Sequence, residues 1–399
     1  MFTKPEARIT ENLGSACAIC GGEAEAILDL PGLPLTDTFT RDAVSDPITG
    51  IDQVLLFCAV CGHAQLEFQV SPNILYGGNY CFRTSASSTA RKGTDFFFSV
   101  LDRAAPGRNF RCALDLGCND LFLLERLKGR AGERVGVDPL WQGREAEGRT
   151  NGIHVIGQGI EDVDLSILSE KPDLVVCRHT LEHIAKPLEV VSRMLDVAAD
   201  DAMFIFEVPG LDTLVERNRF DQVFHQHLHY FSQSSFTRML KKVGAKPVYW
   251  DFNYPDWGAF AVAFHRDGSA SEAAGEKPPP RKDDVLQSLE KFSAQINSTR
   301  KILENLNELT YGYGAAQMLP VLAYHLETDF GFLEAVLDDD PEKDGLTYWN
   351  LPVRVMPSDK AGNLENASVI ITAVDSSGPI MKKLLSENPR QIINPLQLD

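Results

Sequence analysis

Apolar residues in the middle of the chain form short runs that alternate with segments of helical periodicity. Residues 111–116 are a largely apolar run that leads into a glycine turn, and residues 121–127 continue with helical spacing. Further strand-like runs follow at 134–138, 154–157 and 172–177. Because strands that alternate with helices usually form parallel sheets, this order predicts an α/β domain with a doubly wound sheet.

The carboxyl-terminal part of the chain has a pattern of its own. Residues 267–284 are polar, small and proline-rich, as in an exposed linker. A helix is predicted to begin near Asp284, because apolar residues then recur at three-, four- and seven-residue steps. These residues are Val285, Leu289, Phe292, Ile296, Leu303 and Leu306. A glycine turn at 310–314 and a strand that ends at Asp338 predict a second Rossmann-like domain, which either binds a ligand or only packs against the rest.

Composition and charge exclude several classes of protein. The chain has 399 residues, of which 44% are hydrophobic and 24% charged, so two or three folded domains are expected. Its 38 Lys and Arg against 56 Asp and Glu give a net charge of −18, which disfavours binding to nucleic acid or an anionic membrane. The amino terminus lacks the apolar core of a secretory signal, and no apolar run reaches the roughly 18 residues of a membrane span. We therefore expect a cytoplasmic protein.

Four of the eight cysteines form two matched pairs. Cys17 and Cys20, and then Cys58 and Cys61, have CxxC spacing, and a glycine follows each pair. Zinc takes four thiolates in a tetrahedron, and a CxxC turn brings two of them to one ion. The pairs therefore predict a zinc ribbon-like module with a structural Zn²⁺. The alternative is four unrelated buried cysteines.

The turn after the first predicted strand has the features of a nucleotide site. An acid, a glycine turn and a helix follow one another, and the next strand ends in a second acid, where Rossmann-like folds bind a ribose diol. The candidate ligand-binding residues at these strand ends are Asp115, Gly117, Asn119, Asp120, Asp138 and His179. The alternatives are a site for NAD or a purely structural turn, because no GxGxxG motif is present.

A cluster of histidines is the main candidate for acid–base chemistry. His225, His227 and His229 alternate, so a strand would direct all three to one face. Histidine moves protons near neutral pH and also binds metals. A general base, a metal site and a packing role therefore all remain open, although no other motif completes a set of metal ligands.

The motifs together resemble one family. The two CxxC pairs, DLGCND at 115–120, FDQVFHQHLHYFS at 220–232 and YGYGAAQMLP at 311–320 occur in the order found in three-domain sugar C-methyltransferases, which act on nucleotide-linked 4-keto deoxysugars. The resemblance implies a class I methyltransferase core with S-adenosylmethionine as methyl donor, and a carboxyl-terminal domain that helps to enclose the sugar nucleotide. It implies that Asp115 and Gly117 contact the donor's methionine and ribose parts, and that Asp138 binds the ribose hydroxyls.

The same resemblance assigns the reacting groups. His227 would be the general base that forms an enolate, and Tyr80 would be an active-site tyrosine, although an aromatic residue after a Gly-Gly turn is more often a packing residue. Two family residues are replaced, since the tyrosine falls on Phe224 and the glutamate on Gln226. His225, His229, Tyr230 or Tyr80 would then have to supply the lost contact.

These replacements leave two other functions open. One is an O-methyltransferase that acts on a hydroxyl of a sugar or related metabolite. The other is a non-catalytic zinc-ribbon interaction protein with a degenerate methyltransferase fold, because Leu121 stands where glycine-rich turns carry another glycine.

The expected organisation is a zinc-binding module at 1–75, a methyltransferase domain at 76–267, a linker at 268–284 and a Rossmann-like domain at 285–399. The expected partner is a nucleotide sugar, with no nucleic acid and no membrane. An anionic substrate in so acidic a protein requires a local group of Arg and Lys residues, which the sequence does not identify. Oligomeric state stays open, a monomer included.

Overall fold

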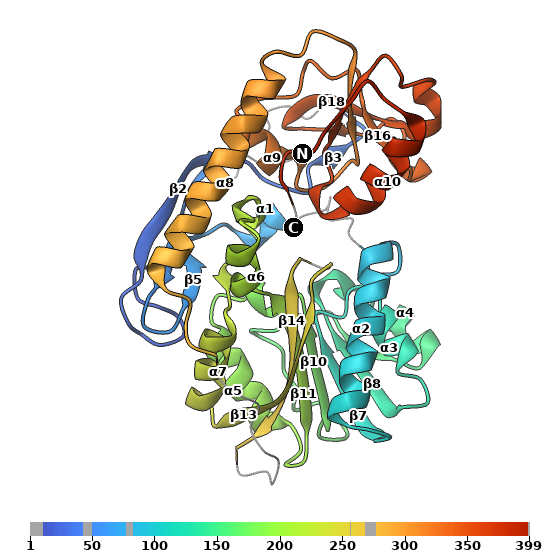
Figure 1. Ribbon diagram of the computed structural model, residues 1–399. Helices are drawn as coiled ribbons and strands as arrows, with labels where there is room; N and C mark the ends of the chain where they lie inside the picture. The colour runs from blue at the N-terminus through green and yellow to red at the C-terminus, as the bar shows by residue number, and fades with distance from the viewer. Residues whose placement is uncertain (1–10, 43–49, 77–82, 256, 268–276, 398–399) are drawn as a thin grey trace.

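The computed structural model describes residues 11–42, 50–76, 83–255, 257–267 and 277–397, which form two lobes with an amino-terminal module at their side (Figure 1). Tyr80 lies outside these residues.

The lower lobe in Figure 1 is built on a seven-stranded sheet of order β13-β14-β11-β10-β7-β8-β9. Its strands are β7 (Phe110–Leu116), β8 (Ala131–Val137), β9 (His154–Ile156), β10 (Leu174–Arg178), β11 (Met203–Pro209), β13 (Ala245–Asn253) and β14 (Ala259–Arg266). β14 runs antiparallel to the other six strands of this sheet. The four predicted strands are confirmed as β7 to β10, and the doubly wound α/β sheet is confirmed with them.

Helices cover both faces of this sheet, and residues of β7 are therefore buried on both sides. Leu114 packs in a cluster with residues of α5 and α7, whereas its neighbour Ala113 packs with α2 and α3. The helices of this lobe are α2 (Ser88–Ala104), α3 (Phe122–Arg126), α4 (Glu145–Gly148), α5 (Pro187–Val197), α6 (Leu211–Glu216) and α7 (Gln233–Lys242). From β7 the chain adds β8 and β9 on one side of that strand, and it then crosses back to add β10 on the other side. In doubly wound sheets a ligand-binding crevice lies at such a reversal, which predicts one here at the carboxyl ends of β7 and β10.

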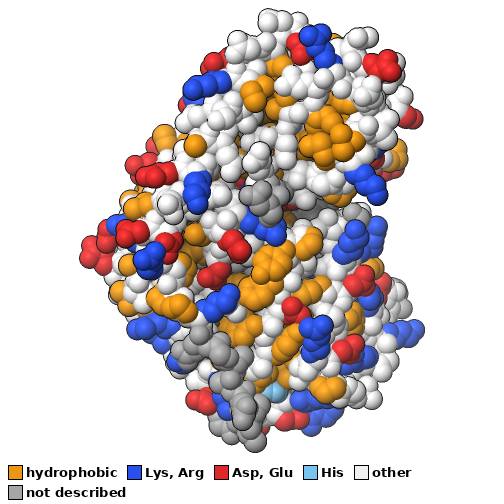
Figure 2. Space-filling view, viewed as in Figure 1, with side chains coloured by type: hydrophobic (Ala, Val, Ile, Leu, Met, Phe, Trp, Pro, Cys, Tyr) orange, Lys and Arg blue, Asp and Glu red, His pale blue; other side chains and the backbone are white. Residues whose placement is uncertain are grey.

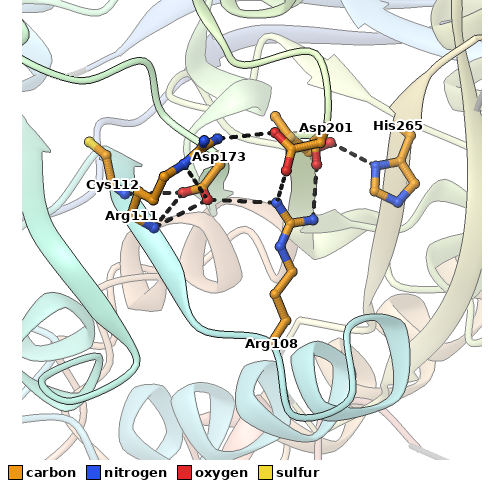
Figure 3. Close-up of polar contacts among 7 residues, drawn as sticks. Arg108, Arg111, Cys112, Asp173, Asp201 and His265 are labelled. Carbon is orange, nitrogen blue, oxygen red and sulfur yellow. Dashed lines mark hydrogen bonds and ion pairs between the residues drawn. The ribbon is translucent and has the colours of Figure 1, made fainter.

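A charged cluster joins the opposite, amino ends of the same strands (Figure 3). Asp173 accepts hydrogen bonds from the backbone N–H groups of Arg111 and Cys112, at 2.9 and 3.0 Å. Its carboxylate also lies 3.6 Å from Arg108 Nη2. Since Asp173 precedes β10 and its partners lie at or just before the start of β7, the cluster ties the amino ends of these two strands together.

The amino-terminal module is a small antiparallel sheet of order β12-β5-β4-β2. Its own strands are β2 (Glu25–Leu33), β4 (Ile51–Cys58) and β5 (His63–Leu66), and short β1 (Glu11–Asn12) pairs with β6 (Phe68–Gln69) before helix α1 (Pro72–Leu75). The edge strand β12 (His229–Tyr230) comes from the histidine-rich segment far along the chain. The module is therefore joined directly to the predicted catalytic segment.

The upper lobe has a sheet of order β20-β19-β15-β16-β18-β17-β3. Its elements are β15 (Thr310–Tyr313), α9 (Leu319–His325), β16 (Val336–Asp338), β17 (Thr347–Tyr348), β18 (Leu351–Pro357), β19 (Ser368–Ile371), α10 (Ser377–Glu387) and β20 (Gln391–Ile393). The edge strand β3 (Phe39–Thr40) belongs to the amino-terminal part of the chain and pairs with β17. The sheet of the upper lobe is thus completed by residues that precede the lower lobe in the sequence.

Helix α8 (Lys282–Leu303) connects the parts and runs from the amino-terminal module to the upper lobe (Figure 1). It begins within two residues of the predicted start, and Val285, Phe292 and Ile296 of the predicted stripe are buried. Leu306 lies beyond its end. Seven 3₁₀ segments complete the described elements: η1 (Pro139–Trp141), η2 (Arg149–Asn151), η3 (Leu181–His183), η4 (Phe220–Gln222), η5 (Pro341–Lys343), η6 (Ser358–Ala361) and η7 (Val374–Ser376).

On the face in Figure 2, Lys and Arg side chains are interspersed with Asp and Glu. Within the described ranges, no helix combines the length and the hydrophobicity that a membrane crossing requires.

Candidate functional site

The loops after β7 and β10 meet at Gly117. This residue has a φ of +79°, and a Cβ atom there would lie 2.2 Å from Thr180 Oγ1, so only glycine fits the contact. Asp115, the acid before it on β7, is 4% exposed, and burial raises its pKa to about 7. The predicted acid and glycine therefore lie at the crevice.

Leu121 takes the place of a further glycine in this turn. It adopts a φ of +68°, a left-handed conformation that costs a leucine roughly 1–2 kcal/mol. Its side chain is buried in the cluster that contains Leu124 and Leu127, and this packing offsets the strain. The leucine is therefore compatible with the turn, which removes the main sequence argument for a degenerate fold.

Asp138 is held at the end of β8 by two backbone donors. Its Oδ2 accepts a hydrogen bond from Asn119 N–H and its Oδ1 one from Leu140 N–H, both at 2.9 Å. Trp141 Nε1 donates to the carbonyl of Asn119 at 2.6 Å, which joins the loops after β7 and β8. A fixed carboxylate keeps lone pairs that can accept hydrogen bonds from a ribose diol. This geometry fits the adenosine part of S-adenosylmethionine.

The side chains of Asn119 and Asp120 hold a neighbouring segment. Asn119 Oδ1 accepts a hydrogen bond from Thr84 N–H at 3.1 Å, and Asp120 Oδ2 accepts one from Ser85 N–H at 2.8 Å. These bonds place the chain before α2 across the turn. Asn119 and Asp120 thus shape the predicted cofactor site from its rim.

His179 lies at the end of β10 between two buried carboxylates. Its Nδ1 is 3.7 Å from Glu182 Oε1, and its Nε2 is 3.7 Å from Glu207 Oε1. Arg178 Nε donates to Glu207 Oε2 at 2.5 Å. Burial alone would raise the pKa of Glu207, but the charge of Arg178 and the contact with His179 lower it to about 2. Glu207 is therefore ionised, and its carboxylate holds the side chain of Arg178 at the end of β10.

A second cluster lies just beyond His179 and contains His227. His183 Nε2 and His227 Nε2 are each 4.0 Å from Glu182 Oε1. Glu182 is fully buried and His227 is 6% exposed. Burial holds the pKa of His227 well below its usual range, so its imidazole is neutral. The sequence analysis missed Glu182 and His183, for which the Leu-Glu-His run after β10 was the available signal.

The three alternating histidines do not share one face, because the segment is not a strand throughout. Residues 225–226 form a turn and only His229 lies in a strand, so the three rings separate. His225 Nε2 is 2.9 Å from the carbonyl of Leu33, and His229 Nδ1 is 3.1 Å from His63 Nε2 in β5. Of the three, His227 is the one whose ring lies beside Glu182.

The replaced family residues surround His227 with apolar and neutral groups. The ring centroid of Phe224 lies 4.2 Å from that of His227, and the ring centroid of Trp257 lies 5.9 Å from it. Gln226 Nε2 donates to Thr36 Oγ1 at 2.7 Å, in the amino-terminal part of the chain. The carboxylate beside His227 is therefore Glu182 and not a residue of the histidine-rich segment.

The four paired cysteines form one compact set. Cys17 Sγ is 3.6 Å from Cys61 Sγ, and Cys20 Sγ is 3.4 Å from Cys58 Sγ. A tetrahedral zinc ion with bonds of about 2.3 Å separates its sulfur ligands by about 3.8 Å, so the set fits zinc. The glycines after each pair have φ of +76° and +71°, as the CxxC-Gly pattern predicts. Since cysteine fills all four positions, the zinc is structural.

Comparisons with known proteins agree with both sites. A family model described as "Methyltransferase domain" matches residues 89–249, and one described as "Putative zinc binding domain" matches residues 17–76. Together with the strand order and the two sites, these matches define a class I methyltransferase fold that uses S-adenosylmethionine and carries an amino-terminal zinc-binding module.

The C-methyltransferase NovU of Streptomyces niveus is 24% identical over 246 residues, which are 58% of this chain and 56% of that protein. The chain thus spans about half the length of this curated relative. Among solved structures, an S-adenosylmethionine-dependent methyltransferase from Clostridium acetobutylicum is 14% identical, with a TM-score of 0.36, and covers 46% of this chain and 94% of its own. N-methyltransferase NodS from Bradyrhizobium japonicum, in complex with S-adenosyl-L-homocysteine, has the same identity and TM-score and covers 46% and 90%.

Replacement of Asp138 should weaken cofactor binding. Asp138→Asn removes the negative charge of the carboxylate. That carboxylate accepts hydrogen bonds from two backbone N–H groups and is predicted to accept them from the ribose diol. A hydrogen bond to a charged group contributes about 1.5–3 kcal/mol, so the dissociation constant for S-adenosylhomocysteine should rise roughly 10- to 100-fold. Titration calorimetry measures the change. Asp196→Asn, at an exposed position of α5, is the matched control and should bind as the wild type does. Unchanged affinity in Asp138→Asn would exclude the predicted role.

Proposed function

We propose that the protein transfers a methyl group from S-adenosylmethionine to the carbon beside the ketone of a nucleotide-linked keto-deoxysugar. The observation that carries the proposal is His227, a buried neutral imidazole whose Nε2 lies 4.0 Å from a buried carboxylate near the crevice. The similarity to NovU, a protein named as a C-methyltransferase, and the four ordered sequence motifs support the same reaction.

The chemistry begins with the carbon acid beside the ketone. His227 Nε2 takes the proton, and the electron pair moves into the ketone to form an enolate. The enolate carbon then attacks the electrophilic methyl group that bound S-adenosylmethionine would supply. The carbon–carbon bond forms as the methyl–sulfur bond breaks, and S-adenosylhomocysteine leaves. The imidazolium that forms at His227 is stabilised by Glu182 at 4.0 Å. Glu182 thereby takes over the part of the family glutamate that Gln226 replaces.

The surroundings of the base favour this proton transfer. The ring centroids of Phe224 and Trp257 lie 4.2 and 5.9 Å from that of the imidazole, and His227 is only 6% exposed. In such a dry environment the attraction between an imidazolium and a carboxylate is stronger than in water. The burial that keeps His227 neutral before the reaction therefore also strengthens its partnership with Glu182 after the proton has moved.

A pocket beside Trp257 contains a candidate contact for the nucleotide phosphates. Its lining includes Arg217, Arg219 and, from the upper lobe, Asp375. Arg219 is paired with Asp221 and Asp375, whereas the guanidinium of Arg217 lies 5.1 Å above the ring of Tyr254. Arg217 is thus the side chain that we propose for contact with a diphosphate. The pocket also supports a role for the upper lobe in enclosing the substrate.

Proton exchange tests the proposed function. The enzyme is incubated with nucleotide-linked 4-keto deoxysugars in deuterium oxide, first with S-adenosylhomocysteine and then with S-adenosylmethionine. We expect deuterium to enter at the carbon beside the ketone in the first incubation, and a C-methyl product in the second. An O-methyl product without deuterium at carbon would replace the proposal with methylation of a hydroxyl. The phenylalanine at position 224, where the family has a tyrosine, favours that reaction. No exchange and no product would refute both.

A further inference from the structure

Glu182 is a buried carboxylate that lacks the usual compensation. Its side chain is 0% exposed, and no residue in the described part of the chain donates a hydrogen bond to either carboxylate oxygen. A carboxylate in such a place is strongly disfavoured unless positive charge lies beside it. The nitrogen atoms of His179 at 3.7 Å and of His183 and His227 at 4.0 Å all lie beyond hydrogen-bond distance of Glu182 Oε1. The cluster therefore has room for a cation.

The hydrogen bonding of His183 prepares its free nitrogen as a ligand. His183 Nδ1 lies 2.6 Å from the backbone carbonyl of Gln226, which can only accept, so Nδ1 carries the hydrogen. In the neutral tautomer with its hydrogen on Nδ1, the lone pair belongs to Nε2, which lies 4.0 Å from Glu182 Oε1. A histidine whose second nitrogen donates to a backbone carbonyl is the usual arrangement for a metal ligand, because the bond fixes both the tautomer and the ring orientation.

We infer that Glu182, His183 and His227 form a binding site for a divalent transition-metal ion, and that an ion bound there blocks proton transfer to His227. The carboxylate oxygen and the two imidazole nitrogens lie within 4.8 Å of one another. Metal bonds of about 2.0–2.2 Å bring such ligand atoms to about 3–3.5 Å, which small side-chain rotations achieve. One carboxylate with two imidazoles suits Zn²⁺, Co²⁺, Ni²⁺ or Fe²⁺.

The inhibitory effect rests on the proposed function, because the metal and the substrate proton require the same lone pair of His227 Nε2. The site is chemically distinct from the four-cysteine set. It offers nitrogen and oxygen ligands and leaves coordination positions open, whereas the cysteines surround their ion with sulfur. A metal ion would thus switch off methylation at one place and stabilise the fold at another.

Cobalt binding tests the inference with a signal other than activity. Co²⁺ is added to protein that already holds one equivalent of zinc in its cysteine site, and visible ligand-field absorption is followed together with deuterium exchange into the substrate. We expect one further equivalent to bind without the strong thiolate-to-cobalt band that exchange at the cysteines would produce. Deuterium exchange should fall in proportion to cobalt occupancy.

Two variants and a control locate the site. Glu182→Gln and His183→Asn should each weaken cobalt binding at least about tenfold, since even indirect partners of a metal change affinity by 10- to 100-fold. His154→Asn, at a histidine on β9 outside the cluster, should bind cobalt like the wild type. Zinc content and melting temperature confirm that each variant is folded.

The failures of the two proposals are distinguishable. Zinc-loaded wild type that shows no cobalt absorption would overturn the inferred site, while exchange and methylation would still support the proposed function. Cobalt that binds without slowing exchange would overturn the block. Absence of exchange in the protein without cobalt would instead overturn the proposed function.

Discussion

Replacing His227 by asparagine is expected to abolish deuterium exchange and to lower kcat for methylation by about 10³-fold. The amide of asparagine cannot take a proton at neutral pH, and a positioned general base typically contributes 10²- to 10⁴-fold. Mass spectrometry of the substrate measures exchange, and product formation at saturating substrate measures kcat. Binding of S-adenosylhomocysteine should stay within about twofold of the wild type, because Asp138 and Gly117 make the contacts predicted for the cofactor.

His225→Asn provides the matched comparison. The ring of His225 is tied to the carbonyl of Leu33, and an asparagine amide can keep donating to that carbonyl. We expect exchange to continue at a rate within about tenfold of the wild type, a smaller loss than removal of a base causes. If His225→Asn stopped exchange and His227→Asn did not, the base would have to be reassigned to His225.

Loss of the zinc ion should unfold the amino-terminal module and inactivate the enzyme. Cys58→Ser leaves three thiolates, and the apparent binding free energy of a structural zinc site is on the order of 10 kcal/mol, as large as the stability of many domains. The module contributes β5, on which β12 of the histidine-rich segment pairs. When β5 is lost, His227 loses the frame that holds its turn, so methylation should fall by at least about 10²-fold.

Metal analysis, thermal melting and methylation assays follow these effects together. Zinc content should drop by one equivalent, and an early melting transition should appear. Cys112→Ala is the control, since it removes a buried thiol of β7 outside the four-cysteine set and should cost only the packing of one small side chain, about 1 kcal/mol. A Cys58→Ser protein that retained zinc and activity would show that the module is not held by this ion.

The sequence predicted the parts of the fold that depend on local periodicity. The strands at β7 to β10 and the start of α8 follow from runs and spacings of apolar residues, and the zinc set follows from two CxxC turns. Asp138 could be placed at a strand end because strand ends are themselves local features. Its hydrogen bonds to the loop after β7 agree with that placement.

The sequence did not predict features that depend on distant segments. The alternation of His225, His227 and His229 favoured a strand, but pairing with β5 involves only the last of them, and a turn reorients the other two. Glu182 meets His227 only because β10 and the histidine-rich segment converge at one end of the sheet. Such contacts are set by tertiary packing, which outweighs local preference.

The pairing of β3 with β17 has a consequence for how the protein is made. Thr40 contacts Thr347, which follows it by 307 residues. At roughly 5–20 residues per second, a ribosome needs roughly 15–60 s to add the intervening chain. During that time the amino-terminal strand has no partner at the edge it will occupy. The sheet of the upper lobe can therefore be completed only after the intervening chain has been made, by a segment that is synthesised well before it.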